Sequence, residues 1–349
     1  MNLDRNKEEL LIELNRKIKE DSFEDYFDFL KKNEIFSILS LYMNSSSDVI
    51  EMYVLKDKSK RELIKYIKEN LETILRINFN YIFKDDLVIL KEMVGRIKEK
   101  DYNISDLNIS VNLLRFFKRF YFAQFEYNSN VLNSYMPKET VDTFLKLLND
   151  NNALNENHRT FEIMNYIMYV TSAYGIIDLT SLHRLCEKQL FKISKDKLLR
   201  IIKDFEDTYE YIHVYDSNDV LVCSDVFNTE DIATDFYNSQ SSEYKEYSLS
   251  ELKEIYDGKY VKNLGSYKEF IEYLNDVFDL SDEDISYIID FLIMNYIHLS
   301  YLDKENANEC FLESARDMFD LPDEEIEHMR EITERIYLEG PKWEFRGNI

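Results

Sequence analysis

Two nearly identical stretches of eight residues decide the fold: FDLSDEDI spans Phe278–Ile285, and FDLPDEEI spans Phe319–Ile326, 41 positions later. Each copy predicts the end of one helix, a tight turn and the start of another helix. Ser281 is a natural N-cap, and Pro322 suits the first turn of a helix. The acidic residues that follow lie where the helix dipole stabilises negative charge. We therefore interpret the repeated octet as a helix-start signal rather than a ligand site.

The similarity extends upstream, because FIEYLNDVFDLSDEDI (residues 270–285) aligns with FLESARDMFDLPDEEI (residues 311–326). A period of this length is typical of HEAT and armadillo repeats, but a free-standing solenoid needs about three copies or more. Two copies predict a duplicated helix-turn-helix unit that packs on the preceding domain. We place it in an acidic helical region over residues 229–349.

The net charge of −25 is confined to the second part of the chain. Residues 1–200 hold 31 Lys and Arg and 31 Asp and Glu, whereas residues 201–349 hold 12 and 37. Such an acidic surface repels nucleic-acid phosphates and anionic membranes and attracts a basic partner. The ordinary alternative is a solvated surface. The candidate partner-binding residues are the acidic side chains of the repeated octets: Asp282, Glu283, Asp284, Asp323, Glu324 and Glu325.

Composition predicts a mainly α-helical protein. The 349 residues are 45% hydrophobic, enough for two or three domains, and include only six Gly and three Pro, so helix breakers are scarce. The richness in Tyr, Phe, Ile, Asn and Lys is typical of AT-rich bacterial or phage genomes. No signal peptide or apolar membrane span is apparent, and three widely spaced cysteines fit a reducing compartment, so a cytoplasmic location is expected.

Residues 1–157 predict a multi-helical N-terminal bundle of near-neutral charge. Ser59 and Glu62 have capping-box spacing at the start of an amphipathic helix over Ser59–Leu75. The segment VNLLRFFKRFYFAQFEY, Val111–Tyr127, is apolar nearly all round and predicts a central core helix. Its basic and aromatic part could also stack nucleic-acid bases, although aromatic residues this dense on a helix ordinarily form core.

Residues 158–228 predict a winged-helix-like unit, namely three helices followed by one β-hairpin. The first helix ends near Gly175, the second is capped by Asp178 or Thr180, and the third is capped by Ser194. Two β-rich runs flank the turn residues 216–219 and predict the hairpin. Further capping-box spacings, Ser248 with Glu251 and Ser266 with Glu269, mark helices of the acidic region.

The third helix of this unit offers a nucleic-acid-binding alternative. Its candidate phosphate-contacting residues are Lys195, Lys197, Arg200 and Lys203. The same helix carries Asp196, Asp204, Glu206 and Asp207, and the hairpin is acidic where a DNA-contacting wing needs Lys or Arg. Winged helices also serve as protein-binding modules, so both interpretations stay open.

Two segments of the second part of the chain are distinctive: YGIIDLTSLHRL, Tyr174–Leu185, and GPKWEFRGNI, Gly340–Ile349. They resemble segments of helical bacterial proteins that carry a C-terminal SEC-C zinc-binding tail. In the second, the family's Pro-x-Trp-x-aromatic-Arg-Gly segment stands as Pro341, Trp343, Phe345, Arg346 and Gly347. The resemblance covers roughly residues 160–349. It implies a helical fold and no established activity, and the family's cysteine-rich tail has no counterpart in this sequence.

No catalytic residue, metal site or cofactor is predicted. His183 with Cys186, and His213 with Cys223, match no zinc spacing, and a Cys among leucines is ordinarily a small buried hydrophobe. A single Glu-x-x-His pair, Glu325 with His328, is less than a di-iron bundle requires. Nucleophile-elbow, phosphate-loop and His-Glu-x-x-His motifs are missing from the sequence.

The sequence thus predicts a non-enzymatic interaction or regulatory protein whose acidic C-terminal half engages a basic protein partner. An inhibitor that occupies the basic groove of a nucleic-acid-binding protein is one instance. The alternative is a winged-helix DNA- or RNA-binding regulator, and no membrane partner is expected.

Overall fold

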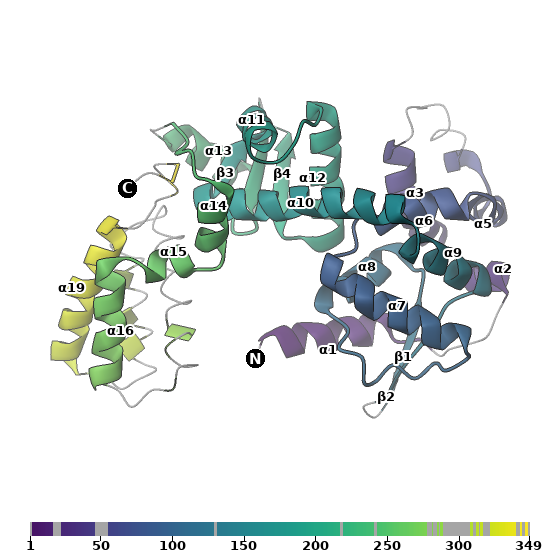
Figure 1. Cartoon of the computed structure of the whole chain (residues 1–349), viewed down its shortest axis with the longest axis horizontal. Helices are drawn as coiled ribbons and strands as arrows, with labels where there is room; N and C mark the ends of the chain where they lie inside the picture. Colours follow the sequence, from purple (N-terminus) through teal and green to yellow (C-terminus); the bar gives the residue numbers. More distant parts are fainter. Residues whose placement is uncertain are drawn as a thin grey trace. The chain divides into compact units, whose positions relative to one another are not determined.

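The chain is mainly helical in the computed structural model, with small antiparallel sheets of two and three strands among the described residues (Figure 1). The structure describes residues 2–16, 22–45, 55–128, 131–216, 219–240, 243–277, 281, 285, 287–288, 308–309, 312–313, 315–316, 322–339, 343 and 346–347. Of the helices within these ranges, none combines the length and the apolar character needed to cross a membrane.

The chain divides into two compact units, which are described separately. The first comprises residues 1–164 and 203–210, and the second comprises residues 165–202 and 211–349. The predicted winged-helix-like unit and acidic region therefore lie mostly in the second unit, while residues 158–164 and 203–210 belong to the first.

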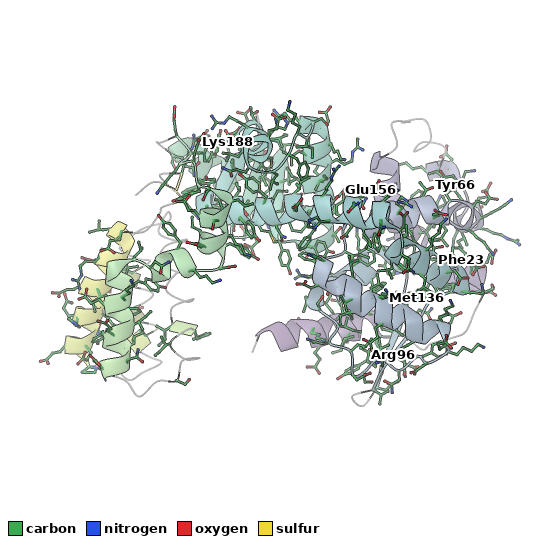
Figure 2. The ribbon with its side chains drawn as sticks, in the orientation of Figure 1. Phe23, Tyr66, Arg96, Met136, Glu156 and Lys188 are labelled. Atoms are coloured by element: carbon green, nitrogen blue, oxygen red, sulfur yellow. The ribbon has the colours of Figure 1, made fainter. Side chains whose placement is uncertain are left out.

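Helices dominate the first unit. Their bounds are α1 Asn2–Leu14, α2 Phe23–Asp28, α3 Lys32–Ser45, α5 Lys60–Glu69, α6 Leu71–Phe79, α7 Lys84–Lys98, α8 Val111–Phe120 and α9 Lys138–Leu148, followed by the beginning of α10 Asn151–Tyr174. The capping box at the start of α5 is confirmed, since the Ser59 and Glu62 side chains each bond the other's backbone N–H. Arg96 lies on α7 (Figure 2). It donates from both terminal nitrogens to the Asp106 carboxylate, at 2.5 and 2.8 Å.

The predicted core helix at Val111 is confirmed only as far as Phe120. Phe116, Phe117 and Phe120 are fully buried on α8. The helix stops because Tyr121 adopts a left-handed conformation, with φ 52°. A hairpin follows, β1 Gln124–Asn128 with β2 Val131–Tyr135, paired from Gln124 opposite Tyr135 to Asn128 opposite Val131. The N-terminal region was predicted as helical throughout, with a helix continuing to Tyr127, so this hairpin was missed, because continuous apolar residues here form a helix and then a strand.

A buried carboxyl at the start of α7 makes the stability of the first unit depend on pH. Asp86 is 5% exposed, and burial raises its pKa from 3.8 to about 6, against the opposing hydrogen bond from Ser110. The folded state thus binds more protons than the unfolded state between these values, so stability falls as pH rises through this window. We expect Asp86→Asn to remove the fall and to raise the free energy of unfolding at neutral pH by about 1–3 kcal/mol.

Urea denaturation between pH 4 and pH 7 measures this effect, and Asp85→Asn provides the matched control because Asp85 is the exposed neighbour. The control should keep most of the wild-type pH dependence, because burial contributes more than the Asp85 charge to the raised pKa of Asp86. An unchanged fall in the Asp86→Asn chain would assign the titration to another group.

The second unit begins with an alternation of helices and short strands. After α10 come β3 Ile176–Asp178, α11 Leu179–Gln189, α12 Lys195–Tyr209, β4 Ile212–Asp216 and β5 Val220–Ser224. The strands form one antiparallel sheet in the order β3-β5-β4, with Ile176 opposite Cys223 and His213 opposite Cys223. Gly175, with φ 71°, ends α10 as predicted, and Asp178 caps α11 by accepting the Ser181 N–H.

The remaining described helices are α13 Glu230–Ser239, α14 Leu249–Tyr256, α15 Lys259–Lys262, α16 Gly265–Val277 and α19 Asp323–Glu339. Helices α16 and α19 lie side by side over one hydrophobic cluster (Figure 1). Equivalent positions of the two sequence repeats share this cluster: Leu274 with Ala315, and Ile285 with Ile326. The duplication thus supplies both sides of one core.

The predicted capping box at Ser266 is wrong, whereas that at Ser248 is confirmed. Helix α16 already begins at Gly265. Ser266 instead donates from its hydroxyl to the Glu339 carboxylate at 2.8 Å and from its backbone N–H at 3.2 Å. A carboxylate at the end of α19 therefore takes the capping role that the spacing had assigned to Glu269.

Candidate functional site

The exposed side of α19 carries a line of carboxylates. Asp323, Glu324, Glu327, Glu331 and Glu334 recur at three- and four-residue spacing and are all exposed. Ile326, Met329, Ile332 and Ile336 occupy the opposite, buried side of the helix. We call these five acidic residues the α19 acidic face.

Only part of the α19 acidic face is neutralised by neighbours. Asp323 pairs with Arg316 at 2.9 Å, and Glu327 pairs with Arg330 at 3.3 Å. Glu324, Glu331 and Glu334 form no ion pair with any residue that the structure describes. These three carboxylates therefore present net negative charge to solvent.

Two of the predicted partner-binding residues, Asp323 and Glu324, thus lie on the α19 acidic face. Glu325 is turned inward and accepts a hydrogen bond from Tyr273 Oη at 2.5 Å, so its carboxylate joins α19 to α16. Burial and this contact together raise the pKa of Tyr273. Asp282, Glu283 and Asp284 lie outside the described residues. Glu327, Glu331 and Glu334 were missed because they follow the octet, although their helical spacing was visible.

The predicted nucleic-acid-binding residues do not form a uniformly basic face. Lys195, Lys197 and Arg200 are exposed on α12, and the Lys195 ammonium donates to Thr180 Oγ1 at 2.8 Å. Asp196 and Asp207 stand one helical turn from Arg200 and Lys203, respectively, so the same side of α12 alternates in charge. The cationic side chains are thus matched by neighbouring carboxylates.

The last two turns of α12 pack within the first unit. Asp204 is 2% exposed and accepts from Tyr81 Oη at 2.7 Å, and the Tyr209 ring meets Phe83 edge-on at 4.8 Å. The β4–β5 hairpin contains Asp216 and Asp219 and no Lys or Arg. These features disfavour insertion of α12 into a groove of nucleic acid.

Within the described ranges, no group of three or more His, Cys, Asp or Glu side chains is arranged to hold a metal ion. His183 donates from Nε2 to Ile193 O at 2.7 Å, which explains its place on α11. Cys186 is 1% exposed, and burial raises the pKa of its thiol to about 12. A thiol of this kind is a poor nucleophile and a poor metal ligand at neutral pH.

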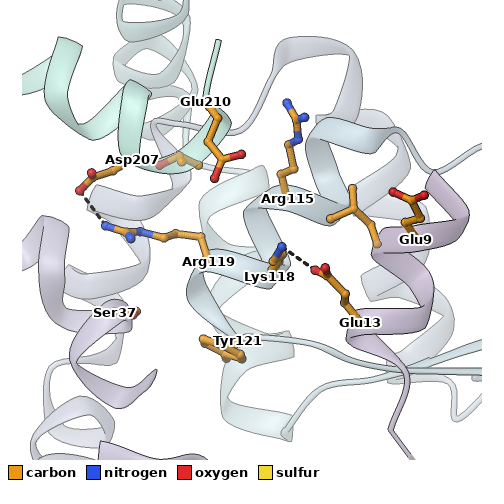
Figure 3. Close-up of a pocket in the computed structure, with 11 residues that line it drawn as sticks. Glu9, Glu13, Ser37, Arg115, Lys118, Arg119, Tyr121, Asp207 and Glu210 are labelled. Carbon is orange, nitrogen blue, oxygen red and sulfur yellow. Dashed lines mark hydrogen bonds and ion pairs between the residues drawn. The ribbon is translucent and has the colours of Figure 1, made fainter. Parts of the chain in front are cut away.

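A pocket of about 390 Å³ opens beside α8 in the first unit (Figure 3). Lys118 pairs there with Glu13 at 2.5 Å and Arg119 with Asp207 at 2.9 Å, while Arg115 donates to Tyr209 O at 2.7 Å. An anionic ligand would have to displace these protein groups. The adjacent Phe rings of α8 face the core instead, so base stacking is not available to them.

The two segments that carry the sequence resemblance contact each other in the second unit. Trp343 is 3% exposed and donates from Nε1 to Ser172 O at 2.8 Å. Its ring lies against Gly175, where a Cβ atom would come within 2.5 Å of the indole. Gly347 lies against Tyr174, where an added Cβ atom would come within 2.9 Å of the ring.

Comparison with known proteins gives no match: no family model matches the chain, and no curated protein or solved structure does so either.

Proposed function

We propose that the protein is a non-enzymatic interaction protein whose acidic C-terminal half engages a basic protein partner. The α19 acidic face carries this proposal, because three of its carboxylates have no ion-pair partner among the described residues. Residues 201–349 hold 37 acidic against 12 basic residues, so the surrounding charge adds to the attraction. Complementary charge accelerates association and selects basic partners over acidic ones.

An inhibitor that occupies the basic groove of a nucleic-acid-binding protein would use such a surface. A row of carboxylates on a helix can stand in for backbone phosphates, since both present regularly spaced negative charge to Lys and Arg side chains. This assignment predicts that the partner loses its nucleic acid when it binds the chain.

Within this proposal, the region from α10 to β5 is a winged-helix-like module that serves protein contacts or architecture. The order helix, strand, two helices and two strands supports this assignment, as does the β3-β5-β4 sheet. The mixed charge of α12 supports a role other than DNA binding. The exposed Lys195, Lys197 and Arg200 nevertheless favour nucleic-acid binding as the second candidate.

A pull-down with tagged full-length chain, with and without nuclease, tests the proposal. We expect a stoichiometric basic protein that survives nuclease and is released by salt. Glu324→Gln, Glu331→Gln and Glu334→Gln together should weaken capture about tenfold or more, because three attractive charges are lost. The matched control, Asp57→Asn with Asp85→Asn and Glu99→Gln, removes as many exposed charges from the first unit and should keep full capture.

The same experiment separates the second candidate. Nucleic-acid binding would replace the interaction proposal if capture were sensitive to nuclease and did not depend on the three α19 carboxylates. In that case capture should disappear when four basic residues are all changed to Glu: Lys195, Lys197, Arg200 and Lys203.

A further inference from the structure

We propose that the second unit contains a peptide-binding groove whose resident ligand is the chain's own C-terminal segment, recognised as Trp-x-x-Arg-Gly. This inference is independent of the proposed function. The described residues of the segment are Trp343, Arg346 and Gly347. The residues that contact them, and that would line the groove, are Tyr174, Gly175, Tyr237, Gln240, Tyr244 and Tyr247.

The tryptophan occupies the deepest position. Its indole lies in a cluster with Ile176, Phe227 and Phe236, and its ring centroid is 5.7 Å from that of Phe227. The absence of a side chain at Gly175 makes room for the ring, and the carbonyl of Ser172 takes the indole N–H. An aromatic anchor in a fitted pocket with its polar atom satisfied is the usual centre of a recognition site.

The side-chain amide of Gln240 forms hydrogen bonds both to the backbone and to the arginine of the segment. Its Nε2 donates to Trp343 O at 2.7 Å, and its Oε1 accepts from Arg346 Nε at 3.2 Å. The side chain is 8% exposed, and its Nε2 also donates to Tyr174 O at 3.4 Å, so the amide is held in place beside the segment. A ligand lacking the arginine leaves the amide oxygen without this donor.

Aromatic rings and backbone groups complete the recognition. The Arg346 guanidinium lies 4.6 Å from the Tyr244 ring centroid and 5.2 Å from that of Tyr237. Lys245 N donates to Arg346 O at 3.1 Å, and Tyr247 Oη donates to Gly347 O. Gly347 has φ 80° and little space for a side chain, so glycine is required there.

These contacts resemble those of a protein with its peptide ligand: an apolar anchor, a cation over aromatic rings and hydrogen bonds to main-chain carbonyls. They lie within five residues of the segment. The segment should therefore bind as a separate molecule when the groove is empty, and connection through the chain serves to raise its effective concentration.

The test uses full-length chain carrying Trp343→Ala and a synthetic peptide of residues Gly340–Ile349. Trp343 is the single Trp of the protein, so the peptide supplies the only indole in the mixture. We expect saturable binding with a blue shift of Trp emission. The wild-type chain, whose groove is filled, should not capture a labelled copy of the peptide.

Peptide variants test the recognition rule. Trp343→Ala in a labelled peptide should weaken binding about 30-fold or more, as for a hot-spot residue. Arg346→Ala should weaken it about fivefold, from loss of the cation–aromatic contact. Adding Gly175→Ala to the Trp343→Ala chain should abolish binding by filling the indole position.

A second measurement covers the case in which Trp343→Ala prevents folding. A protease site replaces residues 340–342, and the folded chain is cut. We expect the cut segment to stay bound at high protein concentration, to dissociate on dilution and to exchange with added peptide. The far-ultraviolet circular dichroism of the rest of the chain should not change, which shows that the fold persists without the segment. Loss of structure on release would show that the segment is an inseparable part of the core and would overturn the proposal. Two other results would also overturn the proposal. One is that a folded Trp343→Ala chain does not bind the peptide. The other is that this chain binds the peptide equally well with and without Gly175→Ala.

Discussion

Replacing Gly175 by alanine should displace Trp343 and destabilise the second unit by about 3–5 kcal/mol. Removal of a buried Trp ring from its packing costs about this much. An alanine Cβ at this position would lie 2.5 Å from Trp343 Cδ2 and 2.6 Å from Cε3, which real structures do not tolerate. The left-handed φ of 71° adds about 1 kcal/mol of strain for a residue with a Cβ atom.

Trp emission measures the displacement of Trp343. Urea denaturation, monitored by circular dichroism, measures the loss of stability. The single Trp makes the emission specific, and a red shift before any denaturation marks its exposure. The matched control is Gly95→Ala, because a Cβ at Gly95 within α7 meets nothing within 4 Å. That change should stabilise the first unit by about 0.5–1 kcal/mol through helix propensity. A buried Trp and an unchanged denaturation midpoint in Gly175→Ala would contradict the described packing.

Asn157→Ala should destabilise the first unit by about 2–5 kcal/mol. Asn157 lies on α10, is 1% exposed, and donates from Nδ2 to the carbonyl oxygens of Phe79 and Ile82, at 2.8 Å each. These carbonyls bound the turn between α6 and α7 and lie beside buried side chains. Truncation leaves the Ile82 carbonyl without this donor, at about 1–3 kcal/mol, whereas the Phe79 carbonyl keeps the Ile82 N–H at 3.2 Å and loses one hydrogen bond, at about 1 kcal/mol.

Thermal and urea unfolding of two further variants define this effect. Asn155→Ala removes an exposed amide from the same helix, and we expect no loss of stability because alanine favours helix. Asn157→Asp retains the shape but turns the donor into an acceptor, so it should be at least as damaging as Asn157→Ala at neutral pH. If Asn157→Ala were no less stable than Asn155→Ala, the two hydrogen bonds would not hold the turn.

Features that depend on neighbours in the sequence were predictable. The caps at Ser59, Asp178 and Ser248 are present because each side chain bonds a backbone N–H three residues ahead. The β4–β5 hairpin followed from alternating residues and a polar turn. The acidic residues of α19 followed from composition, although the inward turn of Glu325 toward Tyr273 required the neighbouring helix.

Features that depend on distant residues were not predictable in the same way. The β1–β2 hairpin escaped prediction because the apolar pattern continues past Phe120, and the left-handed turn at Tyr121 has no signature in the periodicity. Ser266 had suitable capping spacing, yet Glu339 bonds it from 73 positions away. The short strand β3 acquires its identity only by pairing with β5.

The sequence by itself determined the helical class, the starts of α5, α11 and α14, and the confinement of negative charge to residues 201–349. Side-chain periodicity and capping spacing are local, because they involve residues a few positions apart. Composition and net charge are sums over many residues and need no knowledge of the fold. Only the tertiary structure decided that Trp343 packs on Gly175, that its indole bonds a carbonyl 171 positions earlier, and that Gln240 joins the two segments. Such contacts arise because close packing joins surfaces by shape and hydrogen-bond geometry, neither of which is encoded by spacing along the chain.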